Sequence, residues 1–214
     1  MRRLKTTRQA EVLDAALAVA DAQGLGALSM RAVAERMGLT PMALYGYFRS
    51  KGELLDALAG RLLTETARPD PTLSWQDQIR ALAHNALDIA RRHPAVFPLL
   101  YSRPAVDPGA VEFVDVLLQA LLRAGVRPEQ APRLERMIST FILGFAMSTV
   151  SGRFSAGSLD TAARRAQLPS DRLPGHQRLA EHLDAPVDWD AEFDADLDNL
   201  ITMISTVGAA RPAG

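Results

Sequence analysis

Several residues between positions 29 and 51 have side chains suited to binding a partner. Thr40, Tyr45 and Tyr47 carry hydroxyl groups that donate and accept hydrogen bonds, and Lys51 carries a positive charge. The two tyrosine rings can also pack flat against another surface. This stretch therefore indicates a binding surface that donates hydrogen bonds.

The residues that enzymes use for catalysis form no comparable pattern. The chain has no cysteine, which excludes disulfides, a cysteine nucleophile and a thiolate metal site. Of the histidines His84, His93, His176 and His182, the last two lie six residues apart, unlike the i, i+4 pair of a zinc-binding helix. No Asp or Glu belongs to a motif that pairs it with a base or a metal. We therefore expect no enzyme, no cofactor and no metal site, with catalysis kept as a rival hypothesis.

Two short helices must position this binding surface. In the first, Met30, Val33, Ala34 and Met37 recur at helical spacing and form one apolar face. Gly38 then supplies a residue that adopts positive φ without strain, which ends the helix. The sequence therefore predicts a helix that stops at a tight turn.

The second helix starts at Thr40 and Pro41, a hydroxyl N-cap followed by proline at the first helical position. Leu44 and Phe48 lie four residues apart and share a buried face, which leaves the neighbouring side chains outside. Residues 50–53, SKGE, form a capping box that starts the next helix. These parts predict a helix-turn-helix, whose second helix enters the DNA major groove, although the spacing alone also fits an ordinary helical corner.

The detailed string over about residues 7–60 resembles the DNA-binding domain of the tetracycline-repressor family. Its closing run is Leu44, Tyr45, Phe48 and Lys51. The resemblance implies DNA contacts from Arg31, Thr40, Pro41, Met42, Ala43, Tyr45, Tyr47 and Lys51. Thr40 and Lys51 suit phosphates, Arg31 suits guanine, and the apolar positions 41–43 suit thymine methyl groups.

The net charge differs between the N-terminal part of the chain, which contains the predicted helix-turn-helix, and the rest. Residues 1–63 carry nine Lys or Arg against six Asp or Glu, a net +3, while residues 64–214 carry fifteen against nineteen, a net −4. Arg2, Arg3, Lys5 and Arg8 could neutralise phosphates beside a DNA-binding unit, although such an arm also fits a plain solvated tail. No uninterrupted apolar run of about eighteen residues and no signal-peptide pattern occurs, so we expect a cytoplasmic protein without a membrane partner.

The rest of the chain is helical by pattern. A helix over residues 7–23 supports the helix-turn-helix and completes an N-terminal head of three helices. A helix over residues 51–67 connects this head to the rest of the chain, the body. Further helices follow in the body from Ser74, Asp107, Pro128 and about Asp190. Residues 151–176 are rich in Gly, Ser, Pro and Arg and predict a loop, with a helical turn near residues 161–167. We expect an all-α fold, with a three-helix DNA-binding domain at 1–50 and a ligand-binding and dimerisation domain at 51–214.

Two helices of the body are candidates for a dimer interface. Gly144, Ser148 and Gly152 are spaced by four on a helix that is otherwise made of large apolar residues, and small residues allow a close approach. The final helix carries an apolar stripe of Phe193, Leu197, Leu200, Ile201 and Ile204. In the family, these two helices form a four-helix bundle across a two-fold axis, which implies a homodimer and a pseudo-palindromic operator in double-stranded DNA.

Residues 74–148 resemble the C-terminal domain of the tetracycline repressor itself, through SWQ at 74–76, SRP at 102–104 and LGF at 143–145. The positions that would hold the drug and its magnesium are instead Leu82, Leu99 and Ser148, and leucine offers no donor atom to that cation. We therefore expect a mainly apolar small-molecule effector. Candidate lining residues, each of which also fits a plain core position, are Leu82, Asn85, Leu99, Tyr101, Phe113, Leu117, Phe141 and Phe145.

The resemblance implies a ligand-responsive transcriptional regulator, most simply a repressor. Effector binding in the body would move the connecting helix, so that the two recognition helices lose the spacing of successive major grooves. An activator and a helical adaptor that binds only protein are the alternatives. Retention of specific DNA against excess nonspecific competitor separates the regulator from the adaptor.

Overall fold

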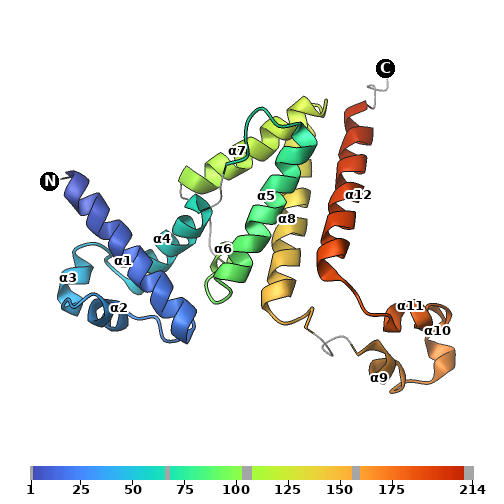
Figure 1. The fold of residues 1–214 in the computed structure, drawn as a ribbon, viewed down its shortest axis with the longest axis horizontal. Coiled ribbons are helices and arrows are strands. Elements are labelled where there is room, and N and C mark those ends of the chain that lie inside the picture. Colours follow the sequence, from blue (N-terminus) through green and yellow to red (C-terminus); the bar gives the residue numbers. More distant parts are fainter. Residues whose placement is uncertain (1, 66–67, 103–107, 156–159, 210–214) are drawn as a thin grey trace.

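The structure is a computed structural model that describes residues 2–65, 68–102, 108–155 and 160–209 (Figure 1). All regular secondary structure in these ranges is helical, which confirms the predicted all-α fold class. Among these residues, no helix is both long enough and apolar enough to cross a membrane.

The first three helices form the head, at the left of Figure 1: α1 (Arg2–Gln23), α2 (Met30–Arg36) and α3 (Pro41–Tyr45). The head core contains side chains that are at most 1% exposed: Val12, Ala16, Leu28, Val33, Leu44 and Phe48. Because α1 starts at Arg2 rather than at the predicted Thr7, the basic N-terminal residues belong to this helix.

The turn between α2 and α3 has the predicted cause. Gly38 has a φ of +66°, in the left-handed region that residues with a β-carbon rarely adopt. The amide of Leu39 then donates to the carbonyl oxygen of Ala34 at 2.9 Å, which closes the end of α2.

Helix α4 (Lys51–Thr64) connects the head to the body. It packs against α1 in the head and against α6 (Leu99–Ser102) and α7 (Pro108–Arg123) in the body. The predicted end of this helix at residue 67 lies outside the described residues, and α4 itself ends at Thr64. One continuous helix therefore contacts both parts of the chain.

The body is built around α5 (Trp75–Arg92), α7 and α8 (Ala131–Val150), each of which packs against the other two. The last helix, α12 (Trp189–Ala209), lies beside α5 and α8 (Figure 1). Polar contacts tie it to α5: Arg80 reaches Asp198 at 2.6 Å, and His84 Nε2 lies 3.0 Å from Asp194. Helix α12 therefore packs against the other body helices of its own chain.

The segment predicted as a loop contains more helix than expected. After the described residues resume at 160, short helices follow: α9 (Thr161–Arg165), the 3-10 turn η1 (Ser170–Arg172), α10 (Pro174–Arg178) and α11 (Ala180–Asp184). The Thr161 hydroxyl donates to the carbonyl oxygen of Leu183 at 2.9 Å, and Arg165 pairs with Asp184. The predicted N-cap Asp107 lies outside the described residues, and its helix is observed from Pro108.

Candidate DNA-binding surface and ligand cavity

The residues predicted to contact DNA lie close together on α2, on α3 and at the start of α4. Seven of them are exposed: Arg31, Thr40, Pro41, Met42, Ala43, Tyr45 and Lys51. Met42 is 77% exposed, although it is one of the large apolar side chains of the head. Tyr47 differs from the prediction, because it lies beyond the last residue of α3 and packs partly against the core.

Local hydrogen bonds and buried side chains hold this surface in place. Leu44 and Phe48, 0% and 1% exposed, anchor α3 to the head core. The Thr40 hydroxyl oxygen accepts a hydrogen bond from the Ala43 amide at 3.4 Å, which caps α3. Ser50 caps α4 in the same way, with Lys51 as the first residue of that helix. The short helix α3 therefore presents its outer side chains from a rigid base.

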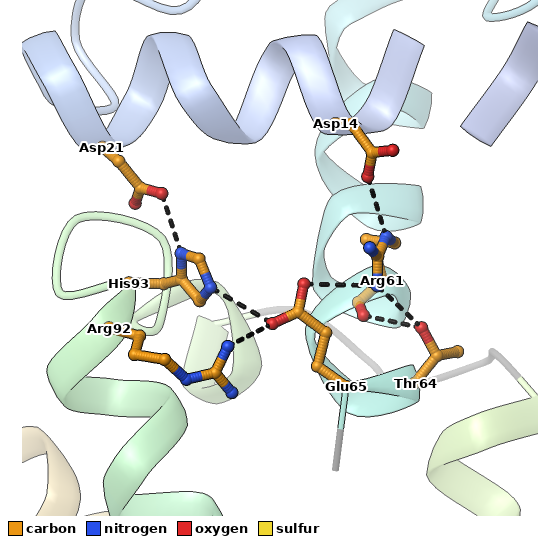
Figure 2. Close-up of polar contacts among 7 residues, drawn as sticks. All are labelled: Asp14, Asp21, Arg61, Thr64, Glu65, Arg92 and His93. Atoms are coloured by element: carbon orange, nitrogen blue, oxygen red, sulfur yellow. Dashed lines mark hydrogen bonds and ion pairs between the residues drawn. The ribbon is translucent and has the colours of Figure 1, made fainter. Parts of the chain in front are cut away.

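A polar network joins the head to the body where α1, α4 and α5 meet (Figure 2). His93 directly follows the last residue of α5, and its Nδ1 lies 2.7 Å from Asp21 on α1. Its Nε2 lies 3.2 Å from Glu65, just past the end of α4, and Arg92 donates to the same Glu65 oxygen at 2.8 Å. The two ring nitrogens of His93 therefore face two carboxylates, one on α1 and one just past the end of α4.

Arg61 extends this network along α4. Its Nε donates to Asp14 on α1 at 3.1 Å, and its Nη1 lies 3.2 Å from the second oxygen of Glu65. Burial of Glu65 acts to raise its pKa, but the hydrogen bond from Arg92 and the charges of His93 and Arg61 outweigh it and lower the pKa below its ordinary value. The head therefore contacts the body through charged side chains as well as through α4.

The body contains a cavity of about 150 Å³ between α4, α5, α7 and α8 and the segment around α6. Most of its lining is apolar, with Glu135 and Ser139 of α8 as the polar members. The lining residues are Leu63, Ala86, Ile89, Phe97, Leu100, Phe113, Val114, Glu135, Ser139, Ile142 and Leu143. Leu63 comes from the connecting helix, so the cavity lies against the element that contacts the head.

Of the eight residues predicted to line a ligand pocket, only Phe113 lines this cavity. Leu82, Leu99 and Leu117 are core residues with at most 6% exposure, Asn85 is half-buried, and Tyr101 is 63% exposed. Phe141 and Phe145 instead pack against Phe193 of α12, with ring centroids 5.9 Å and 4.6 Å apart. Seven of the eight residues therefore lie outside this cavity, and their assignment to a ligand pocket stays a prediction.

The sequence does contain a signal for the polar lining residues that were missed. Glu135 and Ser139 are four residues apart and lie in register with the apolar positions Leu134, Ile138 and Ile142 of α8. An acidic residue on such a face is unusual, because carboxylates are rarely buried without a partner.

The residues predicted to form a dimer interface lie in two different environments. Phe193, Leu197, Ile201 and Ile204 are at most 7% exposed, because they pack into the core of their own chain. These four side chains are therefore covered by their own chain in this conformation, and their assignment to a dimer interface stays a prediction. Leu200 is half-buried, on a stripe of α12 that continues through Met203 and Val207.

On α8, Gly144 and Ser148 are half-buried, and no atom lies within 4 Å of the position that a β-carbon on Gly144 would take. Gly152 does not extend this stripe. It lies beyond the end of α8 with a φ of +77°, so its role is to let the chain leave the helix.

Comparison with known proteins gives two family matches along the chain. Residues 12–58 match the family described as "Bacterial regulatory proteins, tetR family". Residues 68–207 match the family described as "Tetracyclin repressor-like, C-terminal domain". The first range includes α2, α3 and most of α4, and the second includes the cavity-lining residues of the body.

Named relatives agree with these matches. The transcriptional repressor DrrR1 of Streptomyces coeruleorubidus is 31% identical over 212 residues, which cover 94% of this chain and 78% of that protein. The class A tetracycline repressor from transposon 1721 of Escherichia coli is 31% identical over 159 residues, covering 73% of this chain and 74% of the repressor.

Solved structures give the same result. ActR from Streptomyces coelicolor, in its apo form, superposes with a TM-score of 0.79 at 25% identity, covering 94% of this chain and 95% of ActR. BioQ bound to its double-stranded DNA operator has a TM-score of 0.60 at 28% identity, covering 82% of this chain and 97% of BioQ. The chain therefore belongs to the tetR family of bacterial regulatory proteins.

Proposed function

We propose that this protein is a ligand-responsive transcriptional repressor that binds a pseudo-palindromic operator as a dimer and is released by a small, mainly apolar effector. The observation that carries the proposal is the path of α4. Its first residue, Lys51, lies beside the exposed surface of α3, and Leu63 near its other end lines the cavity. A change in the cavity therefore has a direct route to the head.

The relatives support both parts of this proposal, small-molecule binding and operator binding. ActR has been solved in complex with the small molecule (S)-DNPA, at 25% identity and a TM-score of 0.79, and BioQ has been solved with its operator. DrrR1 is named as a repressor. We propose a cytoplasmic location for this chain, because binding to an operator requires it.

Within the head, we assign phosphate contacts to Thr40 and Lys51 and base contacts to Arg31 and the outer face of α3. Phosphate contacts fix position without reading sequence, whereas a bidentate arginine contact discriminates guanine. Lys51→Ala should therefore weaken binding to all sequences alike. Arg31→Ala should relax preference at one base pair, at a cost of about 1–3 kcal/mol for the matched base.

The experiment begins with selection of the operator from random duplexes by the purified protein. Fluorescence anisotropy then compares both variants on the selected duplex and on its single-base variants, at one fixed salt concentration. Glu129→Gln, at an exposed acidic position before α8, is the matched control. Equal, sequence-independent losses for Lys51→Ala and Arg31→Ala would refute the assignment, and failure to select any duplex would favour a protein-binding adaptor.

We further propose that the dimer forms through the outer faces of α8 and α12. The free space beside Gly144 allows close approach of a second helix, and Leu200, Met203 and Val207 supply a half-buried apolar stripe on α12. Sedimentation at micromolar concentration tests this proposal. A wild-type monomer would refute it, and Leu200→Glu should shift a dimer toward monomer without unfolding the chain.

Transcription from a promoter that carries the selected operator separates the two modes of regulation. A repressor lowers the number of transcripts, and an activator raises it.

A further inference from the structure

One acidic side chain lines the otherwise apolar cavity. Glu135 is 9% exposed, and it is the acidic member of a lining that includes Ile89, Phe97, Phe113 and Ile142. It belongs to α8, on the face that this helix turns toward α5 and α7. The Glu135 carboxylate therefore lies in a space where a water molecule finds few polar groups to bind.

Within the part of the chain that the structure describes, the surroundings of Glu135 supply one hydrogen bond and no opposite charge. The Ser139 hydroxyl donates a hydrogen bond to Oε1 of Glu135 at 2.7 Å. Among the ion pairs between residues that the structure describes, none involves Glu135, and no described Lys, Arg or His lines the cavity. A carboxylate accepts several hydrogen bonds, so one hydroxyl leaves capacity for a further donor.

Burial of a carboxylate without a cation is unfavourable, because the charge loses its hydration. A positively charged group that enters the cavity restores this interaction at short range and in a poorly solvated space. An anionic ligand would instead meet Glu135 with no compensating cation in the lining. The cavity therefore discriminates between ligands by charge.

We propose that the cavity binds a small amphipathic amine, with its protonated nitrogen against Glu135 and its hydrocarbon part among Leu63, Phe97 and Phe113. A volume of about 150 Å³ corresponds to about five waters at their liquid volume of about 30 Å³ each, which limits the ligand to about five to nine non-hydrogen atoms. This inference rests on the proposed function only where it identifies the amine as the effector; binding of the amine itself is independent of DNA.

Three probes of nearly equal shape test the charge preference: benzylamine, benzyl alcohol and benzoate. Isothermal titration calorimetry of the full-length protein at pH 7 measures each dissociation constant. A hydrogen bond to a charged group is expected to make the amine bind about ten- to a hundredfold more tightly than the alcohol. The carboxylate should bind more weakly than the alcohol.

Substitutions test whether Glu135 causes the preference for the amine over the alcohol. Glu135→Gln keeps the shape and the hydrogen-bonding capacity, so it should remove the amine preference while alcohol binding changes less than about threefold. Glu129→Gln removes an exposed acid of the same protein and should leave all three constants unchanged. Ile142→Trp fills the cavity and should abolish binding of both the amine and the alcohol.

Thermal unfolding without ligand gives a second readout. If Glu135 lacks a cation, Glu135→Gln leaves the Tm unchanged or raises it, whereas loss of a structural ion pair lowers it. An amine that binds wild-type protein no more tightly than the alcohol overturns the proposal, and so does an amine preference that survives in Glu135→Gln. Neither result affects operator binding, so each is distinguishable from failure of the proposed function.

Discussion

The contact between His93 and Asp21 links the body to the head, so its removal should have a measurable effect on stability (Figure 2). His93→Ala and Asp21→Asn, made singly and together, form a double-mutant cycle for this 2.7 Å contact. The side chains are 14% and 28% exposed, so solvent screens the pair only in part. We expect a coupling free energy of about 1–2 kcal/mol, between the values for exposed ion pairs and for buried charged hydrogen bonds.

Urea unfolding followed by circular dichroism measures the cycle. All four proteins need the same chain concentration, because association shifts the apparent unfolding free energy. Arg8 and Glu11 supply a matched control pair on the same helix as Asp21, with side chains that are 56% and 50% exposed at a contact of 3.2 Å. Their coupling should be no more than about 0.5 kcal/mol.

A coupling between His93 and Asp21 as small as that of the control pair would refute the reasoning. It would mean that this contact does not hold the head against the body in solution. The route from the cavity to the head would then consist of α4 alone.

Three further predictions follow from individual contacts. Gly208→Ala should destabilise the fold by about 1–3 kcal/mol, because its β-carbon would overlap the main-chain oxygen of Ala124; Gly175→Ala, with no atom within 4 Å, is the control in thermal unfolding. The lowered pKa of Glu65 means that its contribution to stability is complete above about pH 4.5 and is lost as the pH falls through its folded-state pKa, so unfolding curves of wild type and Glu65→Gln should converge as the pH falls below that pKa. Ser50→Ala should cost about 1 kcal/mol in urea unfolding, because Ser50 caps α4 through the Glu53 amide, and a loss below about 0.3 kcal/mol would contradict this role.

The features that the sequence predicted well depend on neighbours along the chain. Ser50 and Ser74 were expected to cap helices, and each side-chain oxygen accepts a hydrogen bond from an amide three residues later, at 3.1 Å. Thr40 and Gly38 likewise act at the predicted ends of α3 and α2. Caps and positive φ angles are local properties, so periodicity and residue type determine them before any tertiary contact forms.

The features that the sequence could not specify depend on which helix packs against which. The apolar stripe of α12 was assigned to a partner subunit, but Phe193 packs against Phe141 and Phe145 of α8 in the same chain. Hydrophobic spacing identifies a buried face without specifying the surface that covers it. The same limit explains Tyr101, an aromatic residue that was predicted to line a pocket and is 63% exposed.

The cavity and the network of Figure 2 use the same helix ends. Ile89 and Phe97 line the cavity four residues before and after His93, and Leu63 lines it two residues before Glu65. We therefore expect a ligand that displaces these lining residues to displace His93, the partner of Asp21, as well. To weaken operator binding a hundredfold, the ligand must favour the DNA-free conformation by about 2.7 kcal/mol. The expected coupling of about 1–2 kcal/mol between His93 and Asp21 is smaller than this difference, so a ligand with that preference has enough free energy to break the contact.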